Sequence, residues 1–167
     1  MAKEMGKPVT AAFHVQPENI TSTLHLGRSL KNPPVMGFFD TERLCELMAM
    51  SDLYVHAADV EIEAIACLEA VAAGLVPVIA DSPLSATPQF ALDERSLFKA
   101  GDAKDLAERI DWWYEHASTR HQMGKTYAQS AEKYRLKNSI RLAEQMFEEA
   151  ITEGKQKEGK RQSAEKE

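Results

Sequence analysis

The chain has 167 residues and a formal net charge of −6. A hydrophobic content of 44% supports one packed domain, and the acidic balance argues against a nucleic-acid surface, which needs a basic face. The sequence contains neither a secretory signal nor an apolar run long enough to cross a bilayer. We therefore expect a cytoplasmic protein, peripheral at most on the inner face of a membrane.

The N-terminal stretch predicts a strand, a helix and a linker. Residues 8–15, PVTAAFHV, are typical of a buried strand that ends at His14. A helix-start signal follows at Pro17 and predicts a helix to about residue 26. Residues 27–35 contain Gly, Asn and two adjacent prolines, which are typical of a linker.

A strand–helix–strand unit occupies the centre of the chain, after a short strand at residues 35–39 and a helix capped by Asp40 or Thr41. The apolar run LYV that starts at Leu53 is too short for a helix and rich in strand formers. Apolar residues then recur at helical spacing up to a stop at Gly74. The run VPVIA at residues 76–80 is typical of a parallel strand buried on both faces, which predicts a βαβ unit.

Acidic residues crowd the start of the predicted central helix. Asp59, Glu61 and Glu63 lie at its entry, and Glu69 is eight positions after Glu61, so we expect Glu61 and Glu69 on one side of the helix. A helix N-terminus at the carboxyl end of a parallel strand binds anions. Two acids beside such a site suit a ligand with central phosphates and hydroxyls at both ends, such as a nucleotide sugar.

Polar residues also mark two neighbouring positions. His56, at the tip of the first central strand, is interpreted as a structural residue that meets water. Ser82, Ser85 and Thr87 follow the second central strand and either face a ligand or belong to a plain connecting loop. Further along, the sequence predicts an edge strand at residues 96–98 and three helices.

The segments EIEAIACLEA at residues 61–70 and AGLVPVI at residues 73–79 resemble the E-x7-E signature and its continuation. This signature belongs to the retaining, nucleotide-sugar-dependent group-1 glycosyltransferases, which have the GT-B fold of two Rossmann-like domains. The sequence around this signature looks closest to bacterial glucosyltransferases that act on sterols or diacylglycerols. The resemblance runs from about Met36 to Ile151 and implies an α/β fold, a parallel-sheet, Rossmann-like and incomplete half of a GT-B enzyme with C-terminal helices.

The resemblance also implies roles for residues of the central unit. Glu61 would hold the hydroxyls of the donor sugar, and Glu69 those of the ribose. Amides near Ala64 and Ile65 would stabilise the diphosphate, although the family has glycine where Ala64 stands. The implied reaction transfers a hexose, glucose by this likeness, from a UDP-sugar to a lipid or sterol hydroxyl with retention, and no metal is expected.

Three residues near the N-terminus carry weaker implications. The resemblance would place His14 near the transferred sugar as a second catalytic candidate beside Glu61, whereas a strand-end histidine facing solvent is an equal alternative. The family's basic pair neutralises the diphosphate. Arg28 and Lys31 would be that pair, but their spacing is shorter than in the family, and solvated linker charges are the alternative.

The resemblance divides the chain into a remnant at residues 1–35, a partial nucleotide-sugar domain at 36–151, and a charged tail at 152–167 that we expect to be disordered or a frayed extension of the last helix. Because the chain begins to match the family only in the middle of its donor-binding domain, a non-catalytic fragment or nucleotide-binding module is the alternative to an enzyme. The absent strands would leave a sheet edge open, which favours self-association.

Overall fold

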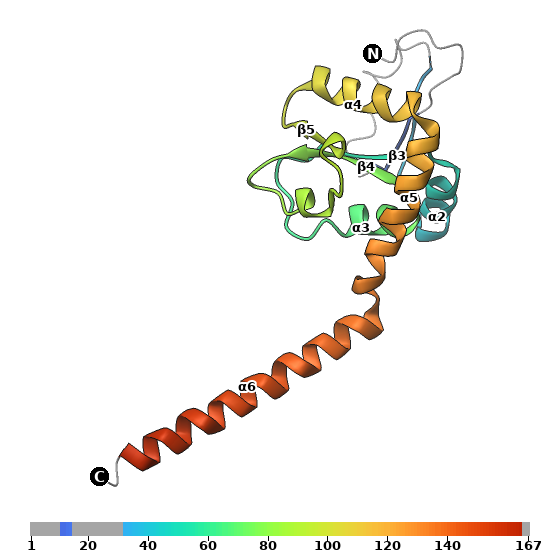
Figure 1. Cartoon of the computed structure of the whole chain (residues 1–167). Coiled ribbons are helices and arrows are strands. Elements are labelled where there is room, and N and C mark those ends of the chain that lie inside the picture. The colour runs from blue at the N-terminus through green and yellow to red at the C-terminus, as the bar shows by residue number, and fades with distance from the viewer. Residues whose placement is uncertain (1–10, 15–31, 165–167) are drawn as a thin grey trace. The chain divides into compact units, whose positions relative to one another are not determined.

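The computed structural model describes residues 11–14 and 32–164 of the chain, which divides into two compact units, Met1–Gln129 and Ser130–Glu167. The predicted helix after Pro17 and the two basic residues Arg28 and Lys31 lie outside the described residues. The fold class expected from the sequence, an α/β protein with a parallel sheet, is what the first unit shows (Figure 1).

A three-stranded parallel sheet forms the centre of the first unit. Its strands are β3 (Leu53–His56), β4 (Val76–Asp81) and β5 (Leu97–Lys99), in the order β3-β4-β5. The register pairs Leu53 with Val76 and Ile79 with Leu97. The edge position predicted for β5 is therefore confirmed, and β4 is central.

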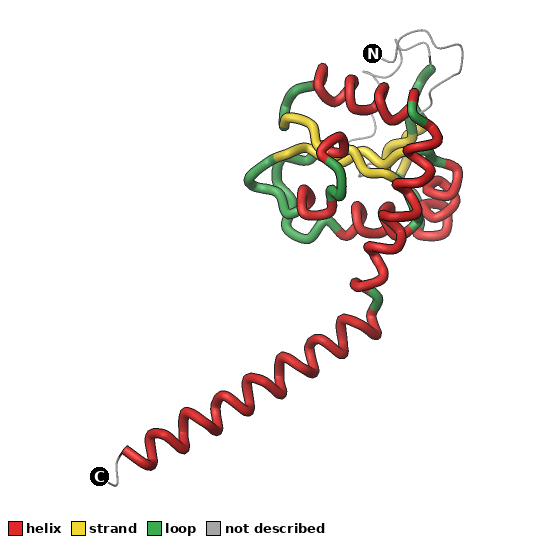
Figure 2. Tube along the Cα trace, in the orientation of Figure 1, coloured by secondary structure: helices red, strands yellow, loops and turns green. Residues whose placement is uncertain are grey.

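Helices cover both faces of this sheet, which explains the uninterrupted apolar run of β4. Helix α3 (Ile65–Ala72) packs against one face and α4 (Ala103–Glu115) against the other (Figures 1 and 2). Residues 76–80 are all buried as a result. Asp102 caps α4 by accepting hydrogen bonds from the amides of Lys104 and Asp105 at 3.0 and 3.1 Å.

Two glycines allow helix α5 (Ala117–Ala131) to approach the turn between α3 and β4. Gly74 ends α3 with a φ of 85°, in the left-handed region that favours glycine, which confirms the predicted stop. A Cβ on Gly124 of α5 would clash with the Gly74 carbonyl oxygen. The buried Tyr127 secures the same helix, since its hydroxyl donates to Ser96 Oγ and accepts from the Leu92 amide, both at 2.9 Å.

A small separate sheet and an exposed helix precede the central sheet in the described part of the chain. Strand β1 (Ala12–His14) pairs in parallel with β2 (Val35–Gly37) in a separate two-stranded sheet. Helix α2 (Thr41–Met50), capped by Asp40 as expected, contains no buried residue. Cys45 of α2 is exposed, whereas Cys67 of α3 is buried.

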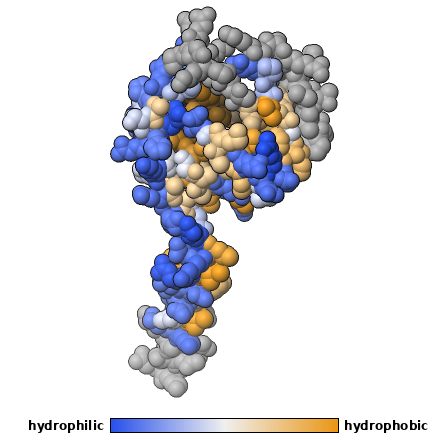
Figure 3. All heavy atoms as spheres, turned by 90° about the vertical axis from the view of Figure 1, so that its right-hand side faces the viewer, coloured by the Kyte–Doolittle hydropathy of each residue, from blue (hydrophilic) through white to orange (hydrophobic). Residues whose placement is uncertain are grey.

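Short 3-10 helices η2 (Thr87–Phe90) and η3 (Glu94–Ser96) connect β4 to β5. The second unit contains η4 (Glu132–Tyr134) and the long helix α6 (Leu136–Ala164). The first part of the charged tail, residues 152–164, continues α6. One side of this helix is apolar (Figure 3), and its Leu136 and Phe147 are 76% and 62% exposed. Within the described part of the chain, no helix combines the length and hydropathy needed to span a membrane.

Candidate functional site

The segment between β3 and α3 carries the candidate site, at the carboxyl end of the parallel strands. Helix α3 begins only at Ile65, because Ala64 before it adopts the left-handed conformation, with φ 53° and ψ 37°. Glu61 therefore lies in a loop, and the helical spacing expected to relate it to Glu69 is wrong. The apolar pattern suggested an earlier helix start, yet Ile62 is 84% exposed.

Backbone pairing with the loop after β4 holds Glu61 in place. Glu61 forms an isolated parallel bridge with Ser85. Its carbonyl accepts from the Ala86 amide at 2.8 Å, and its amide donates to the Leu84 carbonyl at 3.4 Å. Ser82 adds a tie by donating from its hydroxyl to the Asp59 carbonyl at 2.6 Å.

The hydroxyls after β4 therefore organise the loops. Ser85 donates to Thr87 Oγ1 at 3.0 Å and accepts from the Thr87 amide at 3.2 Å. Ser82 and Thr87 are themselves buried. Of the two readings of these residues, the connecting loop is the one that the contacts support.

The carboxylate of Glu61 folds back over the amides that follow it. Its Oε1 accepts from the amides of Ile62 at 2.9 Å and Glu63 at 3.3 Å. The pKa of Glu61 is held below its ordinary value chiefly by the Ala64 amide and next by the Glu63 amide, since both favour the ionised form. The amides leading into α3 thus bind an anion, and in this structure that anion is the protein's own carboxylate.

A partly buried pair of rings, those of Tyr54 and His56, lies beside Glu61 at the end of β3. The Tyr54 hydroxyl and His56 Nδ1 are 3.1 Å apart and share a hydrogen bond. His56 Nε2 lies 3.9 Å from Glu61 Oε2, beyond hydrogen-bond distance, and the imidazole is only 10% exposed. Among the described residues, Nε2 is the one buried side-chain nitrogen or oxygen without a hydrogen-bond partner.

Burial dominates the electrostatics of these two rings. It lowers the pKa of His56, an effect that the nearby Glu61 charge opposes. It also raises the pKa of Tyr54, and Cys67, Glu61 and Glu69 add to that rise. Both glutamates therefore act on the same hydroxyl, although they do not share a helix. Tyr54 and His56 are residues that the sequence reasoning did not place in the site.

The other candidates are placed as follows. Ala64 and Ile65 belong to the same turn as Glu61, and Glu69 lies further along α3. His14 ends β1 in the two-stranded sheet. Arg28 and Lys31, outside the described residues, keep the roles implied for them as predictions.

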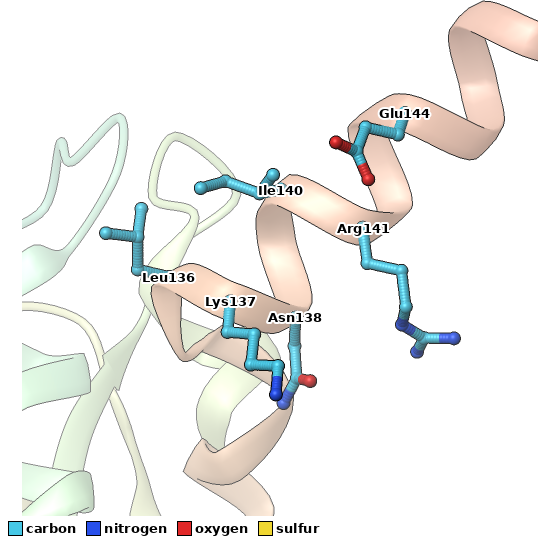
Figure 4. A pocket seen from close by; sticks show the side chains of 6 residues that line it. All are labelled: Leu136, Lys137, Asn138, Ile140, Arg141 and Glu144. Carbon is cyan, nitrogen blue, oxygen red and sulfur yellow. The ribbon is translucent and has the colours of Figure 1, made fainter.

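A shallow groove on the second unit is not a comparable site. Its lining comes entirely from α6, and Figure 4 shows the side chains distributed along successive turns of that helix. Asn138 is already engaged, because its amide nitrogen donates to the Glu132 carbonyl at 2.8 Å. The groove is lined by Leu136, Lys137, Asn138, Ile140, Arg141 and Glu144.

Comparisons with known proteins identify the family to which the chain is similar. A family model described as glycosyl transferases group 1 matches residues 30–130, which include the β3–α3 loop and all of β4. The crystal structure of the catalytic domain of cholesterol-alpha-glucosyltransferase from Helicobacter pylori is 48% identical, with a TM-score of 0.71 over 75% of this chain and 79% of that chain. No curated protein sequence matches. The expected fold class, part of a GT-B architecture, is confirmed by the structural match.

Proposed function

This chain belongs to the group 1 glycosyl transferases, and we propose that its β3–α3 loop binds a UDP-sugar for hexosyl transfer with retention. Glucose is the proposed sugar and a lipid or sterol hydroxyl the acceptor, in line with the similarity to a cholesterol-alpha-glucosyltransferase. The observation that carries the proposal is the anion held by the loop, because the amides of Ile62 and Glu63 already bind a carboxylate.

The proposed chemistry depends on charge that develops in the leaving group. As the glycosidic bond of the donor breaks, negative charge grows on the diphosphate. Amides directed at that position stabilise the transition state more than the ground state. The N-terminal turn of α3 offers such amides, since Ala64 at its N-cap supplies no capping side chain.

The two glutamates would take the two ends of the donor. We assign Glu61 to the hydroxyls of the sugar and Glu69 to those of the ribose. Both are acceptors when ionised, and Glu61 remains ionised well below neutral pH because the loop amides lower its pKa. Donor binding requires Glu61 to exchange its contacts with the amides for contacts with the sugar. His14, Arg28 and Lys31 remain candidates for the neighbourhood of the reacting bond and the diphosphate.

Apolar side chains surround Glu61 and favour an apolar acceptor. Val60, Ile62 and Leu84 are 64%, 84% and 69% exposed. Ile62 follows Glu61 directly, and the Leu84 carbonyl accepts from the Glu61 amide. Exposed apolar clusters mark binding surfaces, so these residues support a lipid or sterol acceptor and a peripheral membrane contact.

A second candidate function is donor binding without catalysis by this chain alone. The observation that favours it is the exposure of helix α2 and of apolar residues beside it. Helix α2 has no buried residue, and Phe38 and Met50 are 58% and 79% exposed. A partner or a second copy of the chain would cover this surface, and we expect self-association at high concentration.

Incubation of the purified chain with UDP-glucose and a detergent-dispersed sterol or diacylglycerol tests both candidates. Multiple turnover with an α-linked product, lost in Glu61→Gln and kept in Glu63→Gln, is the result expected for the enzyme. Binding of UDP-glucose without turnover supports the second candidate. A β-linked product contradicts retention, and the absence of both binding and turnover contradicts the nucleotide-sugar assignment.

A further inference from the structure

We propose that His56 is a positioning residue for Glu61: when the donor is bound, its Nε2–H donates to Glu61 Oε2 and fixes the carboxylate for the sugar hydroxyls. This inference rests on the proposed function. His56 does not touch the reacting atoms in this scheme and acts only through Glu61.

The Nε2 atom of His56 has no hydrogen-bond partner in this structure. A buried polar atom without a partner is rare in proteins and disfavours the state that contains it. Glu61 Oε2 is the acceptor beside it, at 3.9 Å, about one ångström beyond hydrogen-bond distance. A small movement of the Glu61 side chain would satisfy both groups.

Hydrogen bonds to backbone amides keep Glu61 from making that movement here. Its Oε1 is held by the amides of Ile62 and Glu63 at 2.9 and 3.3 Å. A donor phosphate that binds these amides would displace the carboxylate. Glu61 would then need a new hydrogen-bond donor, and Nε2 is the one beside it. In this proposal Glu61 therefore has two positions, the observed one on the amides and a second one on His56.

Tyr54 sets the tautomer of His56 that this role requires. Burial raises the pKa of the Tyr54 hydroxyl, so it keeps its proton. Burial lowers the pKa of His56, so the ring is neutral at pH 7. A neutral imidazole carries one proton. If the Tyr54 hydroxyl donates to Nδ1 across the observed 3.1 Å, the ring proton is on Nε2, which faces Glu61.

Two substitutions separate the two ring nitrogens. The side-chain amide of His56→Gln can place an N–H near the Nε2 position, whereas that of His56→Asn reaches only the Nδ1 position. In calorimetric titrations we expect His56→Asn to bind UDP-glucose about tenfold more weakly and to bind UDP normally, since only the sugar contacts pass through Glu61. His56→Gln should recover most of the loss.

A double-mutant cycle distinguishes action through Glu61 from direct contact with the donor. In the Glu61→Ala background, which removes the acceptor, His56→Asn should change UDP-glucose affinity by less than about twofold. An equal loss in both backgrounds would overturn the proposal, because His56 would then act independently of Glu61. Equal weakening of UDP and UDP-glucose would overturn it as well.

If the wild type does not bind UDP-glucose, the proposed function is contradicted. The tautomer of His56 can still be measured without any ligand, so the inference is tested separately. Long-range ¹H–¹⁵N spectra at pH 7 should show His56 protonated at Nε2, and Tyr54→Phe should shift the ring towards a mixture of tautomers. Protonation of His56 at Nδ1 in the wild type would overturn the positioning role. The fold of each variant is checked by its circular dichroism spectrum.

Discussion

The central strand β4 and the neighbouring β3–α3 loop differ in burial and in backbone conformation. Residues 76–80 of β4 are buried on both faces. Just before this strand, the backbones of Gly74 and Gly124 approach so closely that a Cβ on Gly124 would clash. The loop instead contains an exposed Ile62 and a left-handed Ala64, and it begins beside the unpaired nitrogen of His56, the last residue of β3. Among the described residues, the one non-glycine residue with a left-handed backbone and the one buried side-chain atom without a partner both belong to this region, whereas β4 is packed on both faces.

The largest expected effect on stability comes from Gly124→Ala, which acts on the core alone. The added methyl group would meet the Gly74 carbonyl, a backbone atom that cannot move aside easily. We expect unfolding to become easier by about 1–3 kcal/mol or more, as measured by urea denaturation.

Gly154→Ala is the matched control for that substitution. Gly154 lies in α6 with no atom within 4 Å of an added Cβ, and alanine favours the helix by roughly 0.5–1 kcal/mol. Helix content should therefore be kept or rise. Equal stability of Gly124→Ala and the wild type would contradict the close packing of α5 on the α3–β4 turn.

An intermediate effect is expected from acidification, which acts on the loop. The folded state lowers the pKa of His56, so it binds fewer protons than the unfolded state once the pH falls below about 6.5. The contribution of His56 to the free energy of unfolding is fully present above that pH and is lost as the pH falls through the lowered pKa. Glu61 acts in the same direction at still lower pH, because its pKa is also lowered.

Thermal unfolding followed from pH 8 to pH 5 measures this dependence. His56→Gln removes the imidazole and should flatten the upper part of the profile, whereas His121→Gln, a change at an exposed histidine of α5, should not. A wild-type melting temperature that rises on acidification through pH 6 would contradict the burial of His56.

The smallest effect is expected from Ala64→Gly, which removes strain from the loop. A left-handed conformation disfavours alanine by about 1–2 kcal/mol. The greater freedom of glycine in the unfolded chain offsets about 0.4–1 kcal/mol of the gain. The melting temperature should rise by no more than about 4 °C, while Ala66→Gly, inside α3, should lower it. A lower melting temperature for Ala64→Gly would contradict the left-handed backbone.

Much of the fold could be predicted from local patterns. The apolar run of β4, the stop at Gly74 and the caps at Asp40 and Asp102 each depend on a few neighbouring residues, and the structure contains all of them. The start of α3 could not be predicted, because alanine in the left-handed region leaves no trace in hydrophobic periodicity. Ile62 fits the helical pattern although it points to solvent.

The site was predicted only in part, for a similar reason. Glu61 was identified by its resemblance to a signature, but its neighbours depend on contacts between distant segments. The bridge to Ser85 draws Glu61 back over the end of β3 and brings its carboxylate towards His56. A histidine at a strand tip ordinarily meets water, and no local pattern distinguishes this buried one.

The titration of UDP into the wild type, Glu69→Gln and Glu63→Gln tests the central claim most directly. Both substitutions remove one negative charge from an exposed side chain of the β3–α3 region. The account predicts that wild type and Glu63→Gln bind UDP equally, and that Glu69→Gln binds at least about tenfold more weakly because a charged acceptor for the ribose is lost. Undiminished binding by Glu69→Gln, or no binding by the wild type, would contradict it.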